Sequence, residues 1–413
     1  MNNKLKTVIV IDDYAFINGG AASVAIRTAC YLANNIDLDV YYFSTVGPVT
    51  TDLKEAKLKE IVCLNQDDIL SNSNKYRAFI QGIWNKKSKK ALTTFLNRFD
   101  NKSTIIHIHT WTKALSSSVF EAIEALGFQV VVTLHDYFIS CPNGGYFNYQ
   151  KSEICDLKPM SFRCLSCNCD SRHYYFKLWR VIRQFIQNKN VIGKSNISYI
   201  FISKFSKMQM EKRSFIPNRS VLIDNPVDFN GRYKINAFEN NVFLYLGRLS
   251  EEKGIRLFCE IVDSLGLKAV VIGDGPLKLE MEKKYGKKIL FTGWLSREEI
   301  KPYFEKTRML IFASLLYETL GLTVLEAMAY GIPCLVPDIS AASDLIDDGV
   351  NGFIYKSGNK ESLINAINKS QDNNWVKLLS NNSYNSFQES RYSMTVHVSN
   401  LISTYNSILS NKI

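Results

Sequence analysis

Two carboxylates separated by seven residues lie in the C-terminal third of this 413-residue chain. Glu318 precedes an expected helix over residues 322–330, and Glu326 lies within that helix. At 1.5 Å per residue, the two side chains are about two turns apart along the helix axis. The loop between them offers unpaired backbone N–H groups and a positive helix end. Such an arrangement suits an anionic or hydroxyl-rich ligand, although a surface helix with two ordinary glutamates has the same pattern.

Two cations and several glycines stand at the ends of expected strands in the same half of the chain. Arg248 directly follows Gly247, and Lys253 comes five residues later. Arginine can clamp a diphosphate, and lysine can act as a point charge beside it. Gly273 and Gly293 end two further strands and leave room for a ligand close to the backbone. Turn geometry explains each glycine alone, but together these residues predict a site for a diphosphate flanked by hydroxyl groups, as in a nucleotide sugar.

Polar groups also follow the expected strands of the first half. Gly19 and Gly20 separate a buried strand from an alanine-rich helix, which lets backbone approach a phosphate. The full Gly-x-Gly-x-x-Gly spacing is missing, so a plain tight turn explains the pair as well. His109 and the pair His135-Asp136 follow two later strands. Ligands of open parallel sheets bind outside the carboxyl ends of the strands, so these side chains are site candidates, although a lone histidine is more often structural.

A cysteine-rich insert covers residues 141–173. Cys164-x-x-Cys167 has the spacing of one half of a tetrahedral zinc site, and Cys141 and Cys155 are candidates for the other half. A second Cys-x-x-Cys is missing from the sequence, so buried thiols or a redox-labile cluster are the alternative. The odd total of nine cysteines argues against a disulfide framework.

Short apolar strands alternate with amphipathic helices in both halves and must position these residues. Regular alternation of this kind predicts parallel sheets covered by helices on both faces. A segment rich in proline and asparagine at 216–233 separates the two halves. We therefore expect an α/β protein with two Rossmann-like, doubly wound domains facing across a cleft. The first domain is assigned to residues 1–220 and the second to 221–385, and a C-terminal helix within 386–413 can pack back on the first.

The net charge is +11, and residues 1–200 hold 24 Lys and Arg against 16 Asp and Glu. Two basic, aromatic stretches at 75–99 and 173–192 are helical by periodicity and account for much of this excess. A basic amphipathic helix can lie on an anionic membrane, although a helix that covers a sheet with its charges in solvent is the commoner case. The large apolar residues that interrupt the basic stretches do not fit a nucleic-acid-binding module.

The sequence has no apolar run near the ~20 residues of a membrane span. The N-terminal apolar strand is too short for a signal peptide, because Asp12 and Asp13 end it. We therefore expect a cytoplasmic protein, which the basic helices can bring to the inner face of the plasma membrane.

The motifs of residues 220–380 resemble, in order, those of family 4 retaining glycosyltransferases with the GT-B fold, the glycosyl transferases of group 1. The resemblance is looser over 1–220, where Gly19-Gly20, His107-x-His109 and His135-Asp136 match. The matching motifs of the second half are Gly247-Arg248, Glu251-Glu252-Lys253-Gly254, Gly273-Asp274-Gly275-Pro276, Phe291-Thr292-Gly293, Glu318 and Glu326 with Gly321, Ala329 to Pro333, and Asp348-Gly349-x-Asn351-Gly352.

The resemblance implies a role for each matching position. Arg248 and Lys253 would neutralise the leaving diphosphate, and Glu318 would face the donor sugar near its anomeric carbon. Glu326 would hold the ribose hydroxyls, and His135 would contact the transferred sugar from the other domain. Further donor contacts are implied for Gly19, Gly20, Gly273, Gly293, Leu320, Gly321, Leu322 and Thr323.

The resemblance also implies the reaction. It is a metal-independent, retaining transfer from a UDP- or GDP-sugar, with no cofactor required, to an acceptor hydroxyl on a saccharide or a lipid-linked oligosaccharide. Such enzymes build bacterial O-antigen, capsule or exopolysaccharide. Leu320 stands where the family often has phenylalanine, which affects the sugar pocket but not the backbone contacts. A nucleotide-sugar epimerase or hydrolase on the same fold is the nearest alternative, and a nucleic-acid-binding protein is a more distant one. The sugar, the base and the linkage are not specified by the sequence.

Overall fold

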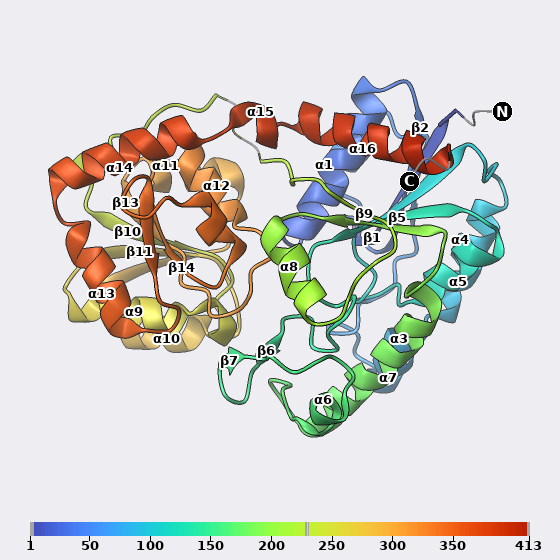
Figure 1. Ribbon diagram of the computed structural model, residues 1–413, viewed down its shortest axis with the longest axis horizontal. Helices are drawn as coiled ribbons and strands as arrows, with labels where there is room; N and C mark the ends of the chain where they lie inside the picture. Colours follow the sequence, from blue (N-terminus) through green and yellow to red (C-terminus); the bar gives the residue numbers. More distant parts are fainter. Residues whose placement is uncertain (1–3, 228, 230, 411–413) are drawn as a thin grey trace.

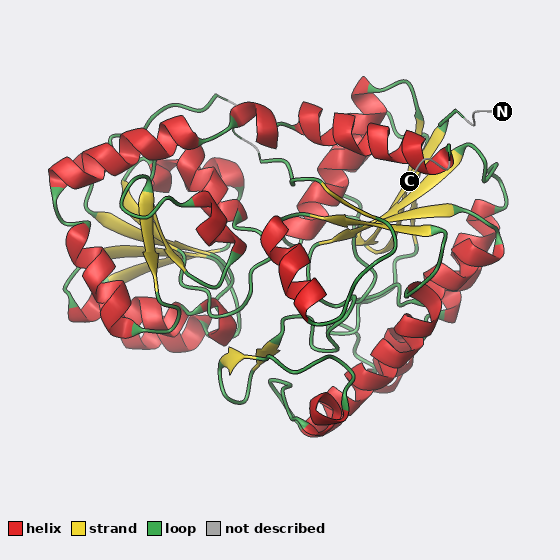
Figure 2. Ribbon diagram, in the orientation of Figure 1, coloured by secondary structure: helices red, strands yellow, loops and turns green. Residues whose placement is uncertain are grey.

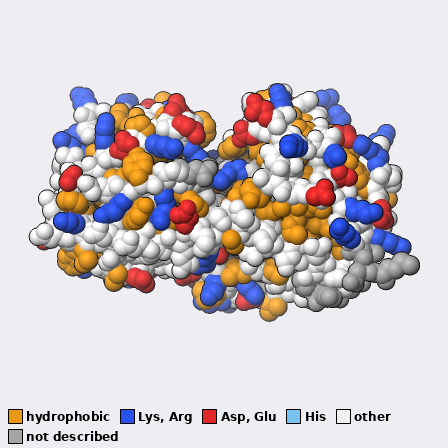
Figure 3. Space-filling model, turned by 90° about the horizontal axis from the view of Figure 1, so that it is seen from above, with side chains coloured by type: hydrophobic (Ala, Val, Ile, Leu, Met, Phe, Trp, Pro, Cys, Tyr) orange, Lys and Arg blue, Asp and Glu red, His pale blue; other side chains and the backbone are white. Residues whose placement is uncertain are grey.

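The computed structural model describes residues 4–227, 229 and 231–410. It contains two α/β lobes, each with a central parallel sheet and helices packed on both faces (Figures 1 and 2). The two doubly wound domains predicted from the sequence are therefore confirmed. Seen from above, the lobes meet at a notch (Figure 3).

The first sheet has seven parallel strands in the order β3-β2-β1-β4-β5-β8-β9. Its inner strands β1, β4 and β8 are buried along their whole length, which explains why they appear in the sequence as continuous apolar runs, whereas the edge strands β3 and β9 are partly exposed. A small antiparallel pair, β6 with β7, belongs to the cysteine-rich insert. The strands of this half are β1 (Thr7–Tyr14), β2 (Asp39–Val46), β3 (Glu60–Cys63), β4 (Thr104–Ile108), β5 (Gln129–Leu134), β6 (Phe147–Asn148), β7 (Glu153–Ile154), β8 (Ile197–Phe201) and β9 (Ser220–Leu222).

The helices of the first half cover this sheet. They are α1 (Gly20–Asn35), α2 (Thr51–Glu55), α3 (Lys75–Ile83), α4 (Lys86–Leu96), α5 (Ser118–Ala125), α6 (Phe162–Ser166), α7 (Tyr174–Val191) and α8 (Lys204–Lys212). Residues 75–99, which periodicity alone gives as one helix, are two. The break falls at Asn85, whose side chain caps α4 by accepting from Ser88 N–H and also donates to the carbonyl of Ala114, at 2.7 Å.

The second sheet has six parallel strands in the order β12-β11-β10-β13-β14-β15. Its strands are β10 (Val242–Leu246), β11 (Lys268–Ile272), β12 (Ile289–Gly293), β13 (Thr307–Ile311), β14 (Cys334–Pro337) and β15 (Gly352–Tyr355). Its helices are α9 (Ile255–Ser264), α10 (Lys278–Tyr285), α11 (Arg297–Phe304), α12 (Leu322–Ala329), α13 (Lys360–Lys369) and α14 (Asn373–Ser386).

After the second sheet the chain returns to the first. Two helices make this crossing, α15 (Glu389–Tyr392) and α16 (Met394–Leu409), and α16 lies against α1 and β5 (Figure 1). The Oη atom of Tyr405 lies 2.6 Å from Nδ1 of His107, inside the first domain. The boundaries drawn at residues 220 and 385 stay predictions, and residues 1–3 and 411–413 lie outside the described part of the chain.

Both sheets reverse their strand order at one point, between β1 and β4 in the first and between β10 and β13 in the second. The loops after these strands diverge to opposite sides of the sheet, so they leave a crevice where ligands of such sheets bind. In the described part of the chain, no helix is long and apolar enough to cross a bilayer.

Candidate functional site

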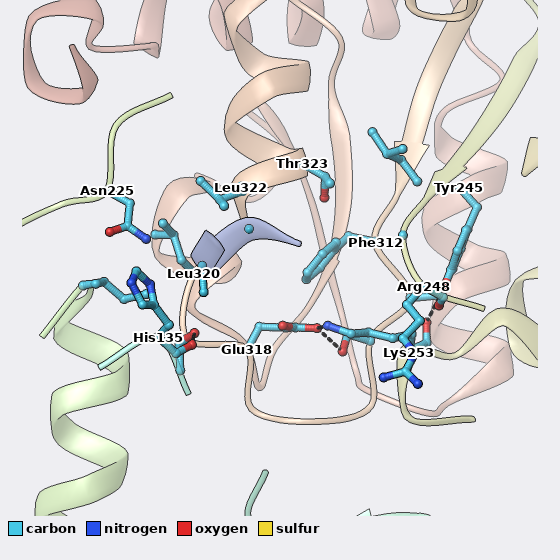
Figure 4. Close-up of a pocket in the computed structure, with 18 of the residues that line it drawn as sticks. His135, Asn225, Tyr245, Arg248, Lys253, Phe312, Glu318, Leu320, Leu322 and Thr323 are labelled. Atoms are coloured by element: carbon cyan, nitrogen blue, oxygen red, sulfur yellow. Dashed lines mark hydrogen bonds and ion pairs between the residues drawn. The ribbon is translucent and has the colours of Figure 1, made fainter. Parts of the chain in front are cut away.

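A cavity of about 280 Å³ lies between the two domains, at the strand ends where both sheets reverse. Residues after β10 and β13 form its second-domain wall. Gly20, His135, Ile202 and Asn225 contribute from the other side. Figure 4 shows Glu318 and Lys253 pointing toward one another, with His135 and Asn225 opposite them.

An ion pair forms the centre of the second-domain wall. Lys253 Nζ lies 2.5 Å from Oε1 of Glu318, and the Ser314 hydroxyl donates to the same oxygen at 2.7 Å. The Glu318 side chain is only 12% exposed, so the carboxylate depends on these two partners for its charge to be compensated. The pair therefore presents a positive and a negative group side by side in one pocket.

Tyr245, in β10, stabilises the loop that carries Arg248 and Lys253. Its hydroxyl donates to the carbonyls of both residues, at 2.9 and 3.2 Å. Gly254 follows with a φ of 68°, and a Cβ there would lie 1.9 Å from the carbonyl oxygen of Ala313. This close approach joins the cationic loop to the end of β13. Arg248 itself is exposed and, within the described residues, forms no ion pair, so its guanidinium is available to an anion.

Two helix N-termini meet at the cavity. α1 begins at Gly20 and α12 begins at Leu322, and neither has a side-chain cap. The helices nearly touch, because a Cβ on Gly20 would lie 3.0 Å from Cδ1 of Leu322. Uncapped N–H groups and two positive helix ends favour a negatively charged group between them.

Two polar atoms at this cavity are buried and have no hydrogen-bond partner within the described residues. They are Oγ1 of Thr323, in the first turn of α12, and Oδ1 of Asn225. Buried polar atoms are normally paired, so an orphan that lines a cavity indicates a ligand or water that pairs with it. These two unpaired atoms therefore indicate a ligand that has polar groups facing both Thr323 and Asn225.

The first-domain wall includes the partly buried His135, which packs on the buried His109. His135 follows β5, and its Nε2 lies 3.0 Å from Nδ1 of His109, with the two rings stacked. Burial lowers the pKa of His135 to about 3, so its imidazole is neutral at physiological pH. The hydroxyl of Thr319 donates to the His135 carbonyl at 2.7 Å, a direct bond between the two domains. Burial raises the pKa of the adjacent Asp136 to about 6.

A second cavity of about 590 Å³ shares five residues with the first, namely His135, Arg248, Lys253, Glu318 and Thr319. Its remaining first-domain wall includes Lys113, Asp136, Tyr149 and Arg180. Glu318 thus separates two spaces, and a molecule in one can meet a molecule in the other at this carboxylate.

Several sequence-predicted residues do not line the first cavity. Gly19 and Gly321 are the residues before α1 and α12, Gly273 directly follows β11, and Gly293 is the last residue of β12. At Gly273 a Cβ would lie 1.9 Å from the carbonyl oxygen of Gly247, so glycine permits close contact between two strand ends, and its contact with a donor stays a prediction. Glu326 pairs with Arg297 at 3.2 Å and lines a separate pocket of about 170 Å³.

Some lining residues were missed from the sequence. Ser314 directly continues the segment after β13, so the rule that places sites at strand ends could have found it. Thr319 lies between two predicted residues, and nothing in its spacing distinguishes it. Asn225 comes from the connection between the domains, where no periodic pattern gives a position. Tyr245 lies within β10, where its apolar ring resembles ordinary core.

The cysteine-rich insert gathers its thiols around a lysine. Lys177 is 1% exposed, and its Nζ donates to Sγ of Cys169 at 3.2 Å and of Cys164 at 3.5 Å. All nine cysteines are free thiols. Over residues 4–227, 229 and 231–410, no group of three or more His, Cys, Asp or Glu side chains is arranged to hold a metal ion. The zinc site predicted at Cys141, Cys155, Cys164 and Cys167 therefore has no support in this arrangement, where the buried cation is the lysine ammonium.

Comparison with known proteins supports part of the family assignment. Residues 232–389 match the family model of glycosyl transferases group 1. The chain is 25% identical over 208 residues to O-antigen chain mannosyltransferase C of Escherichia coli. This alignment covers 48% of this chain and 55% of that protein. The chain is also 28% identical over 236 residues to lipopolysaccharide 1,2-N-acetylglucosaminetransferase of Salmonella typhimurium, and the alignment covers 48% of this chain and 62% of that protein. The chain thus spans less than two thirds of the length of these relatives.

Solved structures extend the likeness of the fold to the whole chain. Sucrose-phosphate synthase of Thermosynechococcus elongatus matches with a TM-score of 0.72 at 15% identity, over 98% of this chain and 100% of that one. Anabaena Alr3699/HepE, solved with UDP and glucose, matches with a TM-score of 0.67 at 17% identity, over 97% of this chain and 99% of that one. These matches confirm the predicted GT-B fold, and the second domain contains a region similar to the glycosyl transferases of group 1.

Proposed function

We propose that this chain is a retaining, family 4 glycosyltransferase that moves a sugar from a UDP- or GDP-sugar to an acceptor hydroxyl. One observation carries the proposal. An exposed arginine, an ion-paired lysine and two uncapped helix N-termini converge on one cavity beside a buried carboxylate. Positive groups in this number suit a diphosphate, and the carboxylate suits sugar hydroxyls.

The proposed donor lies in the smaller cavity. Its diphosphate contacts Arg248, Lys253 and the backbone N–H groups of Leu320 to Thr323, and the Gly19-Gly20 turn approaches it from the first domain. The orphan hydroxyl of Thr323 is a donor for a phosphate oxygen. The sugar lies against Glu318 and His135. Glu326 reaches the ribose hydroxyls after exchanging its contact with Arg297, and residues around Gly293 meet the base.

The proposed acceptor enters through the larger cavity, because this space meets the donor cavity at Glu318 and His135. Its hydroxyl attacks the anomeric carbon on the face from which the diphosphate departs. The bond from carbon to the acceptor oxygen forms, the bond to the phosphate oxygen breaks, and that oxygen takes the acceptor proton. Arg248, Lys253 and the helix ends stabilise the charge that develops on the leaving group. These groups supply the positive charge, so we propose that the reaction needs no metal ion.

Neutral histidines suit this mechanism. Because its pKa is lowered, the His135 ring is uncharged and adds no positive charge beside the sugar. The neutral ring can take part in hydrogen bonds with the sugar hydroxyl groups. The link between Thr319 and the His135 backbone ties the sugar side of the second domain to the first. Bringing the walls together in this way excludes water and favours transfer over hydrolysis.

The proposed acceptor is a saccharide or a lipid-linked oligosaccharide in the synthesis of a bacterial surface polysaccharide, at the inner face of the plasma membrane. Relatives named as O-antigen and lipopolysaccharide transferases support this class. Another, 29% identical over 168 residues, is named for an acceptor linked to diphosphoundecaprenol. The excess of basic residues in the first half is consistent with such an acceptor.

A panel of UDP- and GDP-sugars tests the donor by thermal shift, and mass spectrometry of the product tests transfer. We expect release of nucleoside diphosphate that depends on an acceptor. Glu318→Gln should lower kcat by about a hundredfold or more while the unfolding temperature stays close to that of the wild type. Glu260→Gln is the matched control, because Glu260 is ion-paired to Lys360 on the surface of the same domain. Near-normal turnover of Glu318→Gln, or release of diphosphate without any acceptor, would contradict the proposal.

A further inference from the structure

Helix α7 is turned so that several of its polar side chains are buried while much of its apolar stripe is in solvent. Its buried side chains are Lys177, Trp179, Gln184, Gln187 and Val191. Four large apolar side chains are exposed, with exposed fractions of 61% for Tyr175, 43% for Leu178, 47% for Ile182 and 68% for Phe185. A surface helix normally has the opposite arrangement, because burial of the apolar stripe drives its packing.

The inward polar face is specifically paired, so this orientation is built into the fold. Gln187 receives a hydrogen bond from Trp111 Nε1 at 2.8 Å and donates to the Phe138 carbonyl at 2.8 Å. Gln184 donates to the carbonyl of Ile139 at 2.9 Å, and Arg180 pairs with the fully buried Asp170 at 2.7 Å. Rotating the helix to bury its apolar stripe would break all these contacts and leave buried carbonyls unpaired.

Helix α3 lies beside α7 and extends the apolar surface. The ring of Phe79 packs on Trp179 of α7 with centroids 5.8 Å apart, and Trp179 Nε1 donates to the Phe79 carbonyl at 3.1 Å. On α3, Tyr76 is 74% exposed, Phe79 46% and Ile80 44%. Both helices run along the outer edge of the first domain, away from the second (Figures 1 and 2). We call this the α3–α7 surface, made of Tyr76, Phe79, Ile80, Tyr175, Leu178, Ile182 and Phe185.

The three helices at this surface carry basic but no acidic side chains. Helices α3, α4 and α7 contain no aspartate or glutamate. The neighbouring α5 has two, Glu121 and Glu124, and both are ion-paired, to Lys89 and Lys194. Exposed basic side chains on these three helices are Lys75, Arg77, Lys86, Lys87, Lys90 and Lys189. Large apolar side chains together with lysines and without acids are the composition of helices that lie in the interface of an anionic bilayer. The apolar residues enter the boundary between headgroups and acyl chains, and the lysines meet the phosphates.

We propose that the α3–α7 surface docks the protein on a bilayer that contains anionic phospholipid. Docking goes beyond the proposed reaction, because it needs neither nucleotide sugar nor acceptor. It also orients the enzyme: Arg180, on the inner side of the same α7, lines the larger cavity, so that cavity lies about one helix diameter, ~10 Å, from the bilayer. A lipid-linked acceptor can then place its head in the cavity while its chain stays in the membrane.

Co-sedimentation of the full chain with vesicles tests this. The vesicles are equal parts phosphatidylethanolamine and phosphatidylglycerol, with pure phosphatidylcholine for comparison. We expect binding to the anionic vesicles that weakens with salt, and a loss of about tenfold or more in Ile182→Ser/Phe185→Ser. The matched control is Leu279→Ser/Leu290→Ser, which removes two exposed leucines of the second domain, 81% and 54% exposed, and should bind as the wild type does.

Thermal shift with nucleotide sugars, measured on the same preparations, separates docking from the reaction. All variants should respond to the donor as the wild type does, so a failure to bind vesicles is distinguished from a failure of the proposed function. The proposal is overturned if the wild type stays in the supernatant with anionic vesicles, or if the control variant loses as much binding. It is also overturned if Ile182→Ser/Phe185→Ser instead dissociates a dimer seen by sedimentation velocity and leaves vesicle binding unchanged, because the surface then joins two copies of the chain.

Discussion

Replacing Lys253 by methionine removes its ammonium group and keeps most of its aliphatic stem. In the proposed mechanism this ammonium stabilises the negative charge that grows on the departing diphosphate. Two unit charges about 4 Å apart attract by about 4 kcal/mol at an effective dielectric constant near 20. The Lys253 side chain is 30% exposed, so solvent screens part of this energy, and about 2 to 3 kcal/mol remain. We therefore expect kcat/KM to fall by about 30-fold to 160-fold.

The ion pair adds a second consequence. Without the ammonium, the Glu318 carboxylate keeps only the Ser314 hydroxyl at 2.7 Å as a partner on its Oε1 atom. An under-compensated carboxylate at the donor sugar disfavours the negatively charged donor, so the KM for the donor should rise as well. Lys253→Arg restores the charge with a different shape, so it should recover part of the activity.

Steady-state kinetics with varied donor, at a fixed and saturating acceptor concentration, measure this effect. Lys288→Met is the matched control: Lys288 pairs with Asp263 at 2.5 Å in the same domain but is 67% exposed and lines neither cavity. Its kinetics should match the wild type. If Lys253→Met keeps kcat/KM within about threefold of the wild type with its fold intact, the electrostatic role assigned to this loop is wrong.

Two further predictions concern stability. Burial lowers the pKa of His397 from 6.5 to about 4, so its stabilising contribution is complete above pH 6.5 and is lost as the pH falls through 4. Between about pH 7.5 and pH 4 the wild type should therefore lose roughly 3 kcal/mol more unfolding free energy than His397→Gln, measured by urea titration, and equal losses would contradict the buried neutral imidazole. Gly254→Ala should destabilise the protein by more than Gly266→Ala in thermal unfolding. Both glycines have positive φ, but only the first would bring a Cβ within 1.9 Å of a carbonyl oxygen, whereas nothing lies within 4 Å of the second. Equal effects would show that the clash is relieved by movement of β13.

The sheet architecture could be predicted because buried parallel strands are continuous apolar runs separated by helices. The same rule placed Arg248, Lys253 and Glu318 near one another, since they follow neighbouring strands of one sheet. His135 follows a strand of the other sheet, so its position opposite them depends on how the two domains face each other. Local patterns could not give the orientation of α7. Its sequence contains an apolar stripe, and periodicity identifies the stripe without showing which face meets the domain. The orientation of α7 is set by hydrogen bonds to other parts of the domain. The side-chain amide of Gln187 donates to the Phe138 carbonyl, and that of Gln184 donates to the Ile139 carbonyl.

The cysteine cluster illustrates a different limit. Spacing of Cys164 and Cys167 fits a metal ligand pair, because spacing constrains how far apart two thiols can be in the chain. It says nothing of what else enters the space between the thiols. In the structure the ammonium of Lys177, a buried residue of α7, donates to Cys164 and to Cys169. The inward rotation of one helix therefore accounts both for the lysine among the thiols and for the apolar surface left outside.

Gly20 shows why a site between domains is harder to predict than the domains themselves. As part of a glycine pair before a helix, it is explained equally well by a tight turn or by approach to a phosphate. The structure gives a third reason: a Cβ at this position would lie 3.0 Å from Cδ1 of Leu322, which is 302 positions further along the chain. A larger side chain would press on the start of α12 and widen the cavity. The missing side chain thus sets how closely the two positive helix ends approach, and this separation decides whether one diphosphate can contact both.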